Sequence, residues 1–230
     1  MLSQVRRGCM DNTMTTAREK ITSASCIVAD GGWSTELQKM GLEPGSSPDS
    51  WNLLFPERVS EVARSFVDAG AKVILTNTLG SNKLVLARYG LEDRADEINL
   101  RGAQISREAA GSERLVFGSM GPTGKMLTAG DASEDEIYDS YRVQSDSLWR
   151  GGVDAILIET MVDTEEMKIA GRAARDATPL PVVMSMTFGF GKGRMQTMMG
   201  VAPEQAVAEM EGAGAWMVGA NCGSGPEGFA

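Results

Sequence analysis

The sequence predicts an α/β fold in which helices cover one parallel sheet. Short apolar runs rich in valine and isoleucine alternate with amphipathic stretches of helical periodicity along most of the chain. These apolar runs are mostly not interrupted by polar residues at every second position, which is typical of strands buried on both faces. The six predicted strands are residues 25–29, 72–75, 115–117, 153–158, 181–186 and 216–220.

Start signals mark several of the predicted helices between these strands. Ser133 and Glu136 have the spacing of a capping box, and Asp163 and Glu166 repeat that spacing before the next helix. Pro203 lies where the first turn of the last helix is expected. Each strand is therefore followed by a helix, and the repeated unit is a βα unit.

Periodicity leaves two architectures open, a (β/α)₈ barrel and a doubly wound open sheet. A complete barrel takes roughly 250 residues, whereas about six βα units occupy nearly all of these 230 residues. A barrel would therefore be incomplete here. Residues 1–22 are polar and aperiodic and are predicted to form a flexible tail. Residues 23–230 are predicted to form one α/β domain, which lacks its C-terminal end if it is a barrel.

The composition excludes several classes of function. The chain has no histidine, which removes histidine-dependent nucleophiles and histidine metal ligands. A formal net charge of −9 without a long basic cluster argues against nucleic acid and anionic membranes as partners. No apolar run approaches the ~18 residues of a membrane helix, and the N-terminus does not have the pattern of a signal peptide. A cytoplasmic protein is expected.

Polar or glycine-rich residues follow every predicted strand, at the ends where parallel α/β folds gather their functional residues. Asp30 follows the first strand and Glu159 the fourth, and a carboxylate there can hold a substrate ammonium group or act as a base. A capping or ion-pairing role is the alternative for both. Cys222 follows the sixth strand, while Cys26 lies within the first and is expected in the core.

Six segments at these strand ends resemble, in order, the motifs of the homocysteine S-methyltransferase family. They are DGGWSTELQKMGL (30–42), AGAKVILTNTLGSN (69–82), GSMGPTGKML (118–127), GGVDAILIETMVDTEEMK (151–168), MTFGFGKGRMQTMMG (186–200) and GANCGSGPEG (219–228). The resemblance implies the barrel rather than the open sheet. It also implies zinc-dependent transfer of a methyl group to the thiol of homocysteine, which forms methionine.

The same resemblance implies roles for individual residues. Asp30 and Glu159 would hold the amino group of homocysteine, as the catalytic residues. The substrate-binding residues would be Gly31, Gly32, Asn77, Thr78, Gly118, Ser119 and Asn221. Cys222 would be one of three cysteine ligands of Zn²⁺, but the GGCC motif that holds the other two is absent from this chain. The expected partners are homocysteine and a methyl donor, which is betaine, S-methylmethionine or a methylcobalamin module.

Two other functions fit the residues without the resemblance. A barrel lyase or aldolase would use Asp30 and Glu159 with Lys125 and would need no cysteine pair. A non-catalytic protein would keep the amino-acid pocket and bind without turnover. Zinc content separates the methyltransferase from both alternatives.

Overall fold

The computed structural model describes residues 19–21, 23, 26–191, 193 and 195–223. Its centre is a parallel sheet of five strands in the order β1-β2-β3-β4-β5. The strands are β1 (Val73–Leu75), β2 (Leu115–Met120), β3 (Ala155–Met161), β4 (Val182–Met186) and β5 (Met217–Ala220). Five of the six predicted strands are confirmed, with shifted ends.

The first predicted strand, residues 25–29, is reduced to one parallel bridge between Ala29 and Val73. The Lys72 amide donates to the Val28 carbonyl at 2.8 Å, so this segment does lie beside β1 in the expected place. It has a strand neighbour on one side only among the described residues, and Val28 is 63% exposed. The expectation that Cys26 lies in the core is wrong, because its side chain is exposed.

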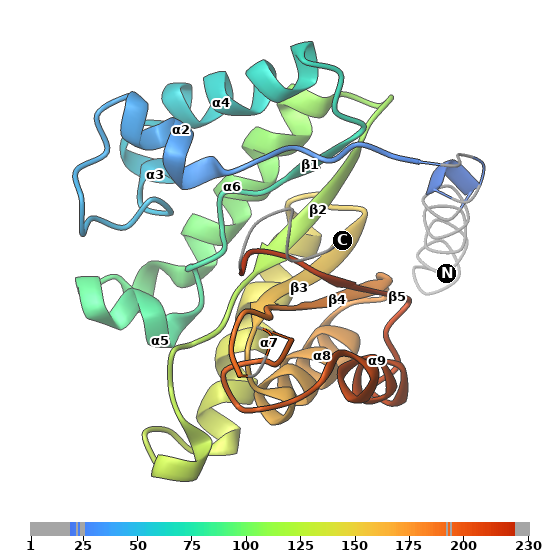
Figure 1. Cartoon of the computed structure of the whole chain (residues 1–230). Helices are drawn as coiled ribbons and strands as arrows, with labels where there is room; N and C mark the ends of the chain where they lie inside the picture. The colour runs from blue at the N-terminus through green and yellow to red at the C-terminus, as the bar shows by residue number, and fades with distance from the viewer. Residues whose placement is uncertain (1–18, 22, 24–25, 192, 194, 224–230) are drawn as a thin grey trace, which may run out of the picture.

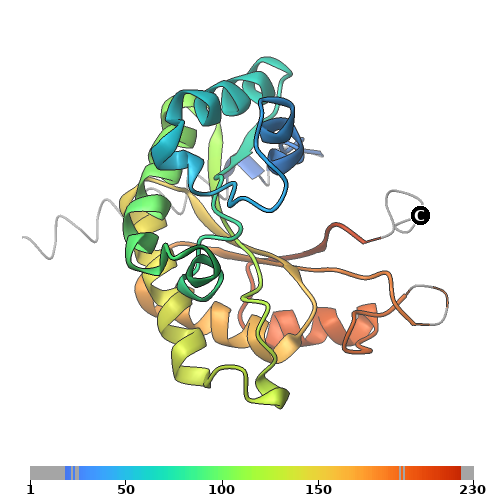
Figure 2. The same cartoon turned by 90° about the vertical axis from the view of Figure 1, so that its left-hand side faces the viewer.

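Helices cover one face of the curved sheet (Figures 1 and 2). The longer ones are α4 (Pro56–Asp68), α6 (Ala95–Ala110), α7 (Glu134–Arg150), α8 (Thr164–Ala177) and α9 (Pro203–Gly212). The shorter ones are α2 (Trp33–Lys39), α3 (Trp51–Leu54) and α5 (Lys83–Leu86), with 3₁₀ turns η1 (Ala87–Tyr89), η2 (Glu92–Arg94) and η3 (Leu127–Ala129). Among the described residues, no helix combines the length and apolarity needed to cross a membrane.

The predicted helix starts are confirmed except in one detail. Ser133 and Glu136 form the capping box of α7, and Pro203 is the first residue of α9. Asp163 caps α8 by accepting a hydrogen bond from the Glu165 amide at 2.8 Å. The predicted partner in that box, Glu166, is instead buried and bonded to Thr123 on the loop after β2.

Two apolar layers lie on opposite faces of the sheet. The larger one packs the sheet against the helices and includes Ile74, Val116 and Ile156, each fully buried. Burial of such a side chain stabilises the fold by roughly 1.5–3 kcal/mol. The smaller layer lies on the concave face and consists of Val73, Leu115, Phe117, Ala155 and Val183.

The described part of the predicted tail contacts this concave layer. Residues 19–21 are helical, and Ile21 packs against the apolar cluster. The Lys20 ammonium donates to the Ser112 carbonyl at 3.0 Å. The rest of the tail prediction, residues 1–18 and 22, lies outside the described residues.

The concave face changes character along each strand. Because side chains alternate between faces, β2 presents Leu115, Phe117 and then Ser119 to the inside. The same alternation on β3 presents Ala155, Leu157 and then Glu159. The apolar residues lie at the amino ends of the strands, and the polar ones lie at the carboxyl ends, where the candidate site is found.

Candidate functional site

A cavity of about 540 Å³ opens at the carboxyl ends of the strands. Its lining draws on the segments at the ends of different strands and includes Gly31, Asn77, Ser119, Glu159 and Cys222. The volume lies within the range of roughly 300–1,000 Å³ that is common for small-molecule sites. Five segments that are far apart in sequence therefore meet around one space.

Glu159 lies within β3, not after it as predicted, and its carboxylate faces the concave side. The Ser119 hydroxyl donates to its Oε1 at 2.5 Å, and the Asn221 amide nitrogen donates to its Oε2 at 3.3 Å. Burial raises the pKa of Glu159, the Ser119 hydrogen bond opposes that rise, and the charge of Asp30 adds to it. Three residues predicted for the site therefore form one hydrogen-bonded group.

Asp30 lies beside this group. One of its carboxylate oxygens accepts hydrogen bonds from the protein, and the other does not. Its Oδ2 accepts hydrogen bonds from the Leu75 amide at 2.7 Å and from the Trp33 indole at 2.9 Å. Its Oδ1 is buried and has no partner among the described residues. Burial raises the pKa of Asp30 to about 6, although both hydrogen bonds oppose this. A buried acceptor without a donor is costly, and a ligand that supplies a donor at this oxygen would remove that cost.

Asn221 joins the ends of three strands through its side-chain amide. Its Oδ1 accepts from the Thr160 amide at 2.9 Å and from the Ser185 hydroxyl at 2.7 Å. Its Nδ2 donates to the Thr160 hydroxyl at 2.8 Å as well as to Glu159. The predicted substrate-binding residue therefore also fixes the geometry of β3, β4 and β5 around Glu159.

Two strained residues flank Asn221. Thr160 has φ 63° and Cys222 has φ 61°, and these are the non-glycine residues with positive φ among those described. Such conformations cost on the order of 1–3 kcal/mol and gather at functional sites. The Thr160 hydroxyl lies 3.8 Å from the Cys222 sulfur, and both residues line the cavity.

Asn77 and Thr78 line the cavity, but their polar side chains are bonded within the protein. The Asn77 amide nitrogen donates to the Pro48 carbonyl at 2.9 Å, and the Thr78 hydroxyl donates to the Ser119 carbonyl at 2.7 Å. Both residues are buried. Asn77 and Thr78 therefore hold the wall of the cavity in place through these hydrogen bonds.

The predicted glycines fall on two different faces. Gly31 and Gly32 line the cavity, and their amides have no acceptor among the described residues. Gly118 belongs to β2 and lies on the opposite face, where an added Cβ would be 3.0 Å from a Leu148 methyl carbon. Because neighbouring residues in a strand face opposite sides, Ser119 reaches the cavity while Gly118 packs against α7.

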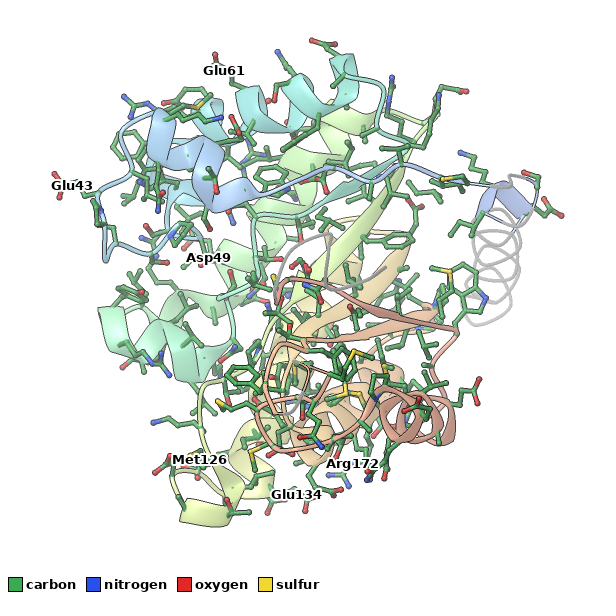
Figure 3. All side chains as sticks on the ribbon, in the orientation of Figure 1. Glu43, Asp49, Glu61, Met126, Glu134 and Arg172 are labelled. Carbon is green, nitrogen blue, oxygen red and sulfur yellow. The ribbon has the colours of Figure 1, made fainter. Side chains whose placement is uncertain are left out.

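Sequence reasoning missed Trp33, which orients Asp30, and Asp49, a buried residue that precedes α3 in the chain and lines the cavity (labelled in Figure 3). The Gly80 amide and the Ser81 hydroxyl donate to Asp49 Oδ1 at 3.0 and 2.9 Å, so Asp49 holds the loop after β1. Burial raises the pKa of Asp49. The sequence did indicate a turn at Asp49, because an aspartate after Ser-Pro is a turn pattern. That local pattern does not reveal the contact with the loop after β1.

The described residues do not make a complete metal site. No group of three or more cysteine, aspartate or glutamate side chains that could hold a metal ion occurs among them. Cys222 is the described cysteine that lines the cavity, and Cys9 lies outside the described residues. Zinc needs three or four protein ligands, so this part of the chain supplies one third of the cysteine set that the sequence resemblance implies.

Comparison with known proteins identifies the scaffold. The family model described as homocysteine S-methyltransferase matches residues 27–230. The chain belongs to the homocysteine S-methyltransferase family. This homocysteine S-methyltransferase domain is 30% identical over 217 residues to the methionine synthase of Mycobacterium leprae (strain TN). It is 32% identical over 225 residues to that of Mycobacterium tuberculosis (strain ATCC 25618 / H37Rv). The alignments cover 87% and 90% of this chain but 18% of each relative.

Solved structures confirm the predicted fold class. The metallated form of the homocysteine methyltransferase MmuM from Escherichia coli matches with a TM-score of 0.76 at 22% identity, covering 89% of this chain and 77% of that chain. Its apo form matches with a TM-score of 0.68 at 21% identity, covering 88% of this chain and 74% of that chain. The five-stranded parallel sheet with outer helices is thus an incomplete (β/α)₈ barrel.

Asp30→Asn should change how the stability of the chain depends on pH. The folded-state pKa of Asp30 lies above its ordinary value of 3.8, at about 6. The folded state therefore holds more protons than the unfolded state between these values, so Asp30 lowers stability as pH rises through them. Relative to Asp30→Asn, the wild-type free energy of unfolding should fall by about 2 kcal/mol from pH 4 to pH 7. Urea unfolding measures this.

The control is Asp139→Asn, which removes an exposed carboxylate on α7. Its curve of unfolding free energy against pH should run parallel to that of the wild type. The same parallel behaviour for Asp30→Asn would show that the Asp30 carboxyl is not perturbed in the folded protein.

Proposed function

We propose that the cavity binds homocysteine and that the domain transfers a methyl group to its thiol, which forms methionine. The observation that carries this proposal is the pair of partly buried carboxylates, Asp30 and Glu159, beside the cavity that Cys222 also lines. Membership in the homocysteine S-methyltransferase family supports it independently.

The amino group of homocysteine fits the acidic end of the cavity. An ammonium group has three donors and no acceptor, and Glu159 presents a carboxylate to the cavity while Asp30 has a buried oxygen without a donor. Its positive charge would offset the burial that raises the pKa of both carboxyls. An ammonium therefore stabilises the site as well as being held by it.

The carboxylate of homocysteine fits the amides of Gly31 and Gly32, which are free of acceptors among the described residues. With both ends of the amino acid held, its thiol would extend toward Thr160 and Cys222. Methyl transfer then forms one sulfur–carbon bond while the donor's bond to that carbon breaks and the electron pair leaves with the donor. The thiol first gives its proton to solvent, so that the thiolate is the species that takes the methyl group, and the residues described here contribute by fixing the position of the sulfur.

Zinc dependence is part of the proposal, on the strength of the family resemblance. The described residues do not fit the metal by themselves, because they bring one cysteine to the cavity. No step of the reaction is therefore assigned through zinc. The lyase alternative is less favoured, because Lys125 follows Gly124 in the chain but is not among the residues that line the cavity.

Replacement of Glu159 should weaken homocysteine binding. Glu159→Gln keeps the shape of the side chain but removes the charge that would face the ammonium group, and hydrogen bonds to charged groups are worth roughly 1.5–3 kcal/mol. Isothermal titration calorimetry with L-homocysteine should show a loss of affinity of about ten- to a hundredfold. Cysteine-derived thiols without an amino group, such as 3-mercaptopropionate, should bind weakly to both proteins.

Glu165→Gln is the matched control, because Glu165 is an exposed glutamate of α8 that pairs with Lys168. It should bind L-homocysteine like the wild type. Equal homocysteine affinity in the wild type and in Glu159→Gln would contradict the assignment of Glu159 as the ammonium-binding carboxylate.

The 230-residue chain should hold little zinc after purification. A single well-placed thiolate cannot provide the set of ligands presented together on which metal affinity depends. Metal analysis should find far less than one zinc per chain, and an assay of methionine formation from homocysteine should show negligible turnover. Stoichiometric zinc that is lost on Cys222→Ser would contradict this expectation and reveal ligands other than the cysteine set.

A further inference from the structure

Strand β3 carries a bulge at residues 159–160. Ile158 pairs with Met184 and Met161 pairs with Met186, so three steps along β3 match two steps along β4. β3 therefore contains one extra residue between these two pairs. A bulge leaves the extra residue without a partner in the ladder and redirects side chains, often beside functional sites.

The bulge changes the face to which the side chains of β3 point. Leu157 packs against the concave apolar cluster, and Glu159 faces the same side. Regular alternation would turn Met161 to the concave side as well. Met161 is instead fully buried in the larger cluster on the helix side. The extra residue thus allows one strand to point Glu159 into the cavity and to return Met161 to the core.

Thr160 is the residue that the bulge strains. It is β-branched and has φ 63°, which is a rare conformation for such a residue. Its amide donates to Asn221 Oδ1 at 2.9 Å, and its hydroxyl accepts from Asn221 Nδ2 at 2.8 Å. The side chain of Asn221 therefore supplies a partner to both the amide and the hydroxyl of the strained residue.

Ser185 fixes the Asn221 side chain from the neighbouring strand, β4. Its hydroxyl donates at 2.7 Å to Asn221 Oδ1, the oxygen that also receives the Thr160 amide. Ser185 is buried, and no residue of β4 lines the cavity. Thr187, which follows β4, donates its hydroxyl to the Asn221 carbonyl at 3.0 Å. The polar side chains at the end of β4 therefore act on Asn221 and not on a ligand.

We propose that Ser185 is a positioning residue of the site. By anchoring the Asn221 side-chain amide, it holds the bulge of β3 and keeps the Glu159 carboxylate turned toward the cavity. The link to Glu159 is short, because Asn221 Nδ2 also donates to Glu159 Oε2 at 3.3 Å. The inference rests on the proposed function where it concerns homocysteine, since Glu159 is the carboxylate assigned to the ammonium group.

Homocysteine affinity in a double-mutant cycle tests whether Ser185 acts through Glu159. Ser185→Ala should weaken binding of L-homocysteine about three- to tenfold in isothermal titration calorimetry, because one buried hydrogen bond is lost. In a Glu159→Gln background the same change should cost less than about twofold, since the carboxylate that Ser185 helps to place is already gone. Equal losses in the two backgrounds would overturn the positioning role.

Rescue by the conservative variant separates the hydroxyl from the packing of the side chain. Ser185→Thr keeps the hydroxyl, and its paired residue on β5, Gly219, has no side chain to obstruct the added methyl group. This variant should bind L-homocysteine like the wild type. The matched control is Ser145→Ala, which removes a buried α7 hydroxyl that donates to the Met120 sulfur at 3.3 Å. It should leave homocysteine affinity unchanged.

Hydrogen exchange of the Thr160 amide tests the same role without any ligand. This amide bonds to Asn221 and not to Ser185, so a looser bulge should make it exchange about tenfold faster in Ser185→Ala, as measured by NMR. The amide of Ile158, in the regular part of β3, should exchange as in the wild type. Unchanged exchange of Thr160, or equal acceleration at Ile158, would overturn the positioning role.

The two measurements also separate this inference from the proposed function. A wild-type chain that does not bind L-homocysteine removes the proposed function, whereas faster exchange confined to Thr160 in Ser185→Ala still supports the positioning of the bulge. Conversely, homocysteine binding that is equal in the wild type and in Ser185→Ala keeps the proposed function and overturns the role of Ser185.

Discussion

The parallel pairing of successive strands is the constraint on which the rest of this structure depends. Each βα unit returns the chain to the same end of the sheet, so the carboxyl ends of β1 to β5 meet at one edge. Side-chain alternation then decides which residues face inward, and it places Ser119, Glu159 and Ser185 on the concave side. Asn221 can bridge β3 and β4 only because their registers bring Thr160 and Ser185 to its level. The cavity is the space that these ends enclose.

The sequence predicted the features that follow from this constraint. Asp30, Glu159 and Cys222 were expected at one mouth because each lies at the end of an apolar run, and the structure brings the first two into electrostatic contact and places Glu159 and Cys222 in the lining of one cavity. The capping box of α7 was also predicted correctly, because it depends on residues three positions apart. Family membership agrees with the order of the motifs.

Features set by contacts between distant segments were not predictable from local patterns. The spacing of Asp163 and Glu166 indicates a capping box. Glu166 instead accepts hydrogen bonds from the amide and hydroxyl of Thr123. These two donors are buried and would be left without a partner, whereas an amide at the exposed start of a helix can bond to water. Gly118 was expected in a substrate-binding loop, yet β2 continues through it and the alternation turns it toward Leu148. Cys26 was expected in the core, but its segment makes one bridge at the side of β1 and leaves the thiol exposed.

The central claim is that the site is built to receive an ammonium group beside Asp30, and the ionisation of that carboxyl tests it most directly. Carbon-13 NMR of the aspartate carboxyl carbons, with Asp30→Asn to assign the signal, measures its pKa with and without saturating L-homocysteine. The free protein should give a pKa of about 6 because the group is buried. Bound homocysteine should lower that pKa, because a positive charge nearby favours the ionised form. A value near the ordinary 3.8 in the free protein, or one that homocysteine leaves unchanged, would contradict the account.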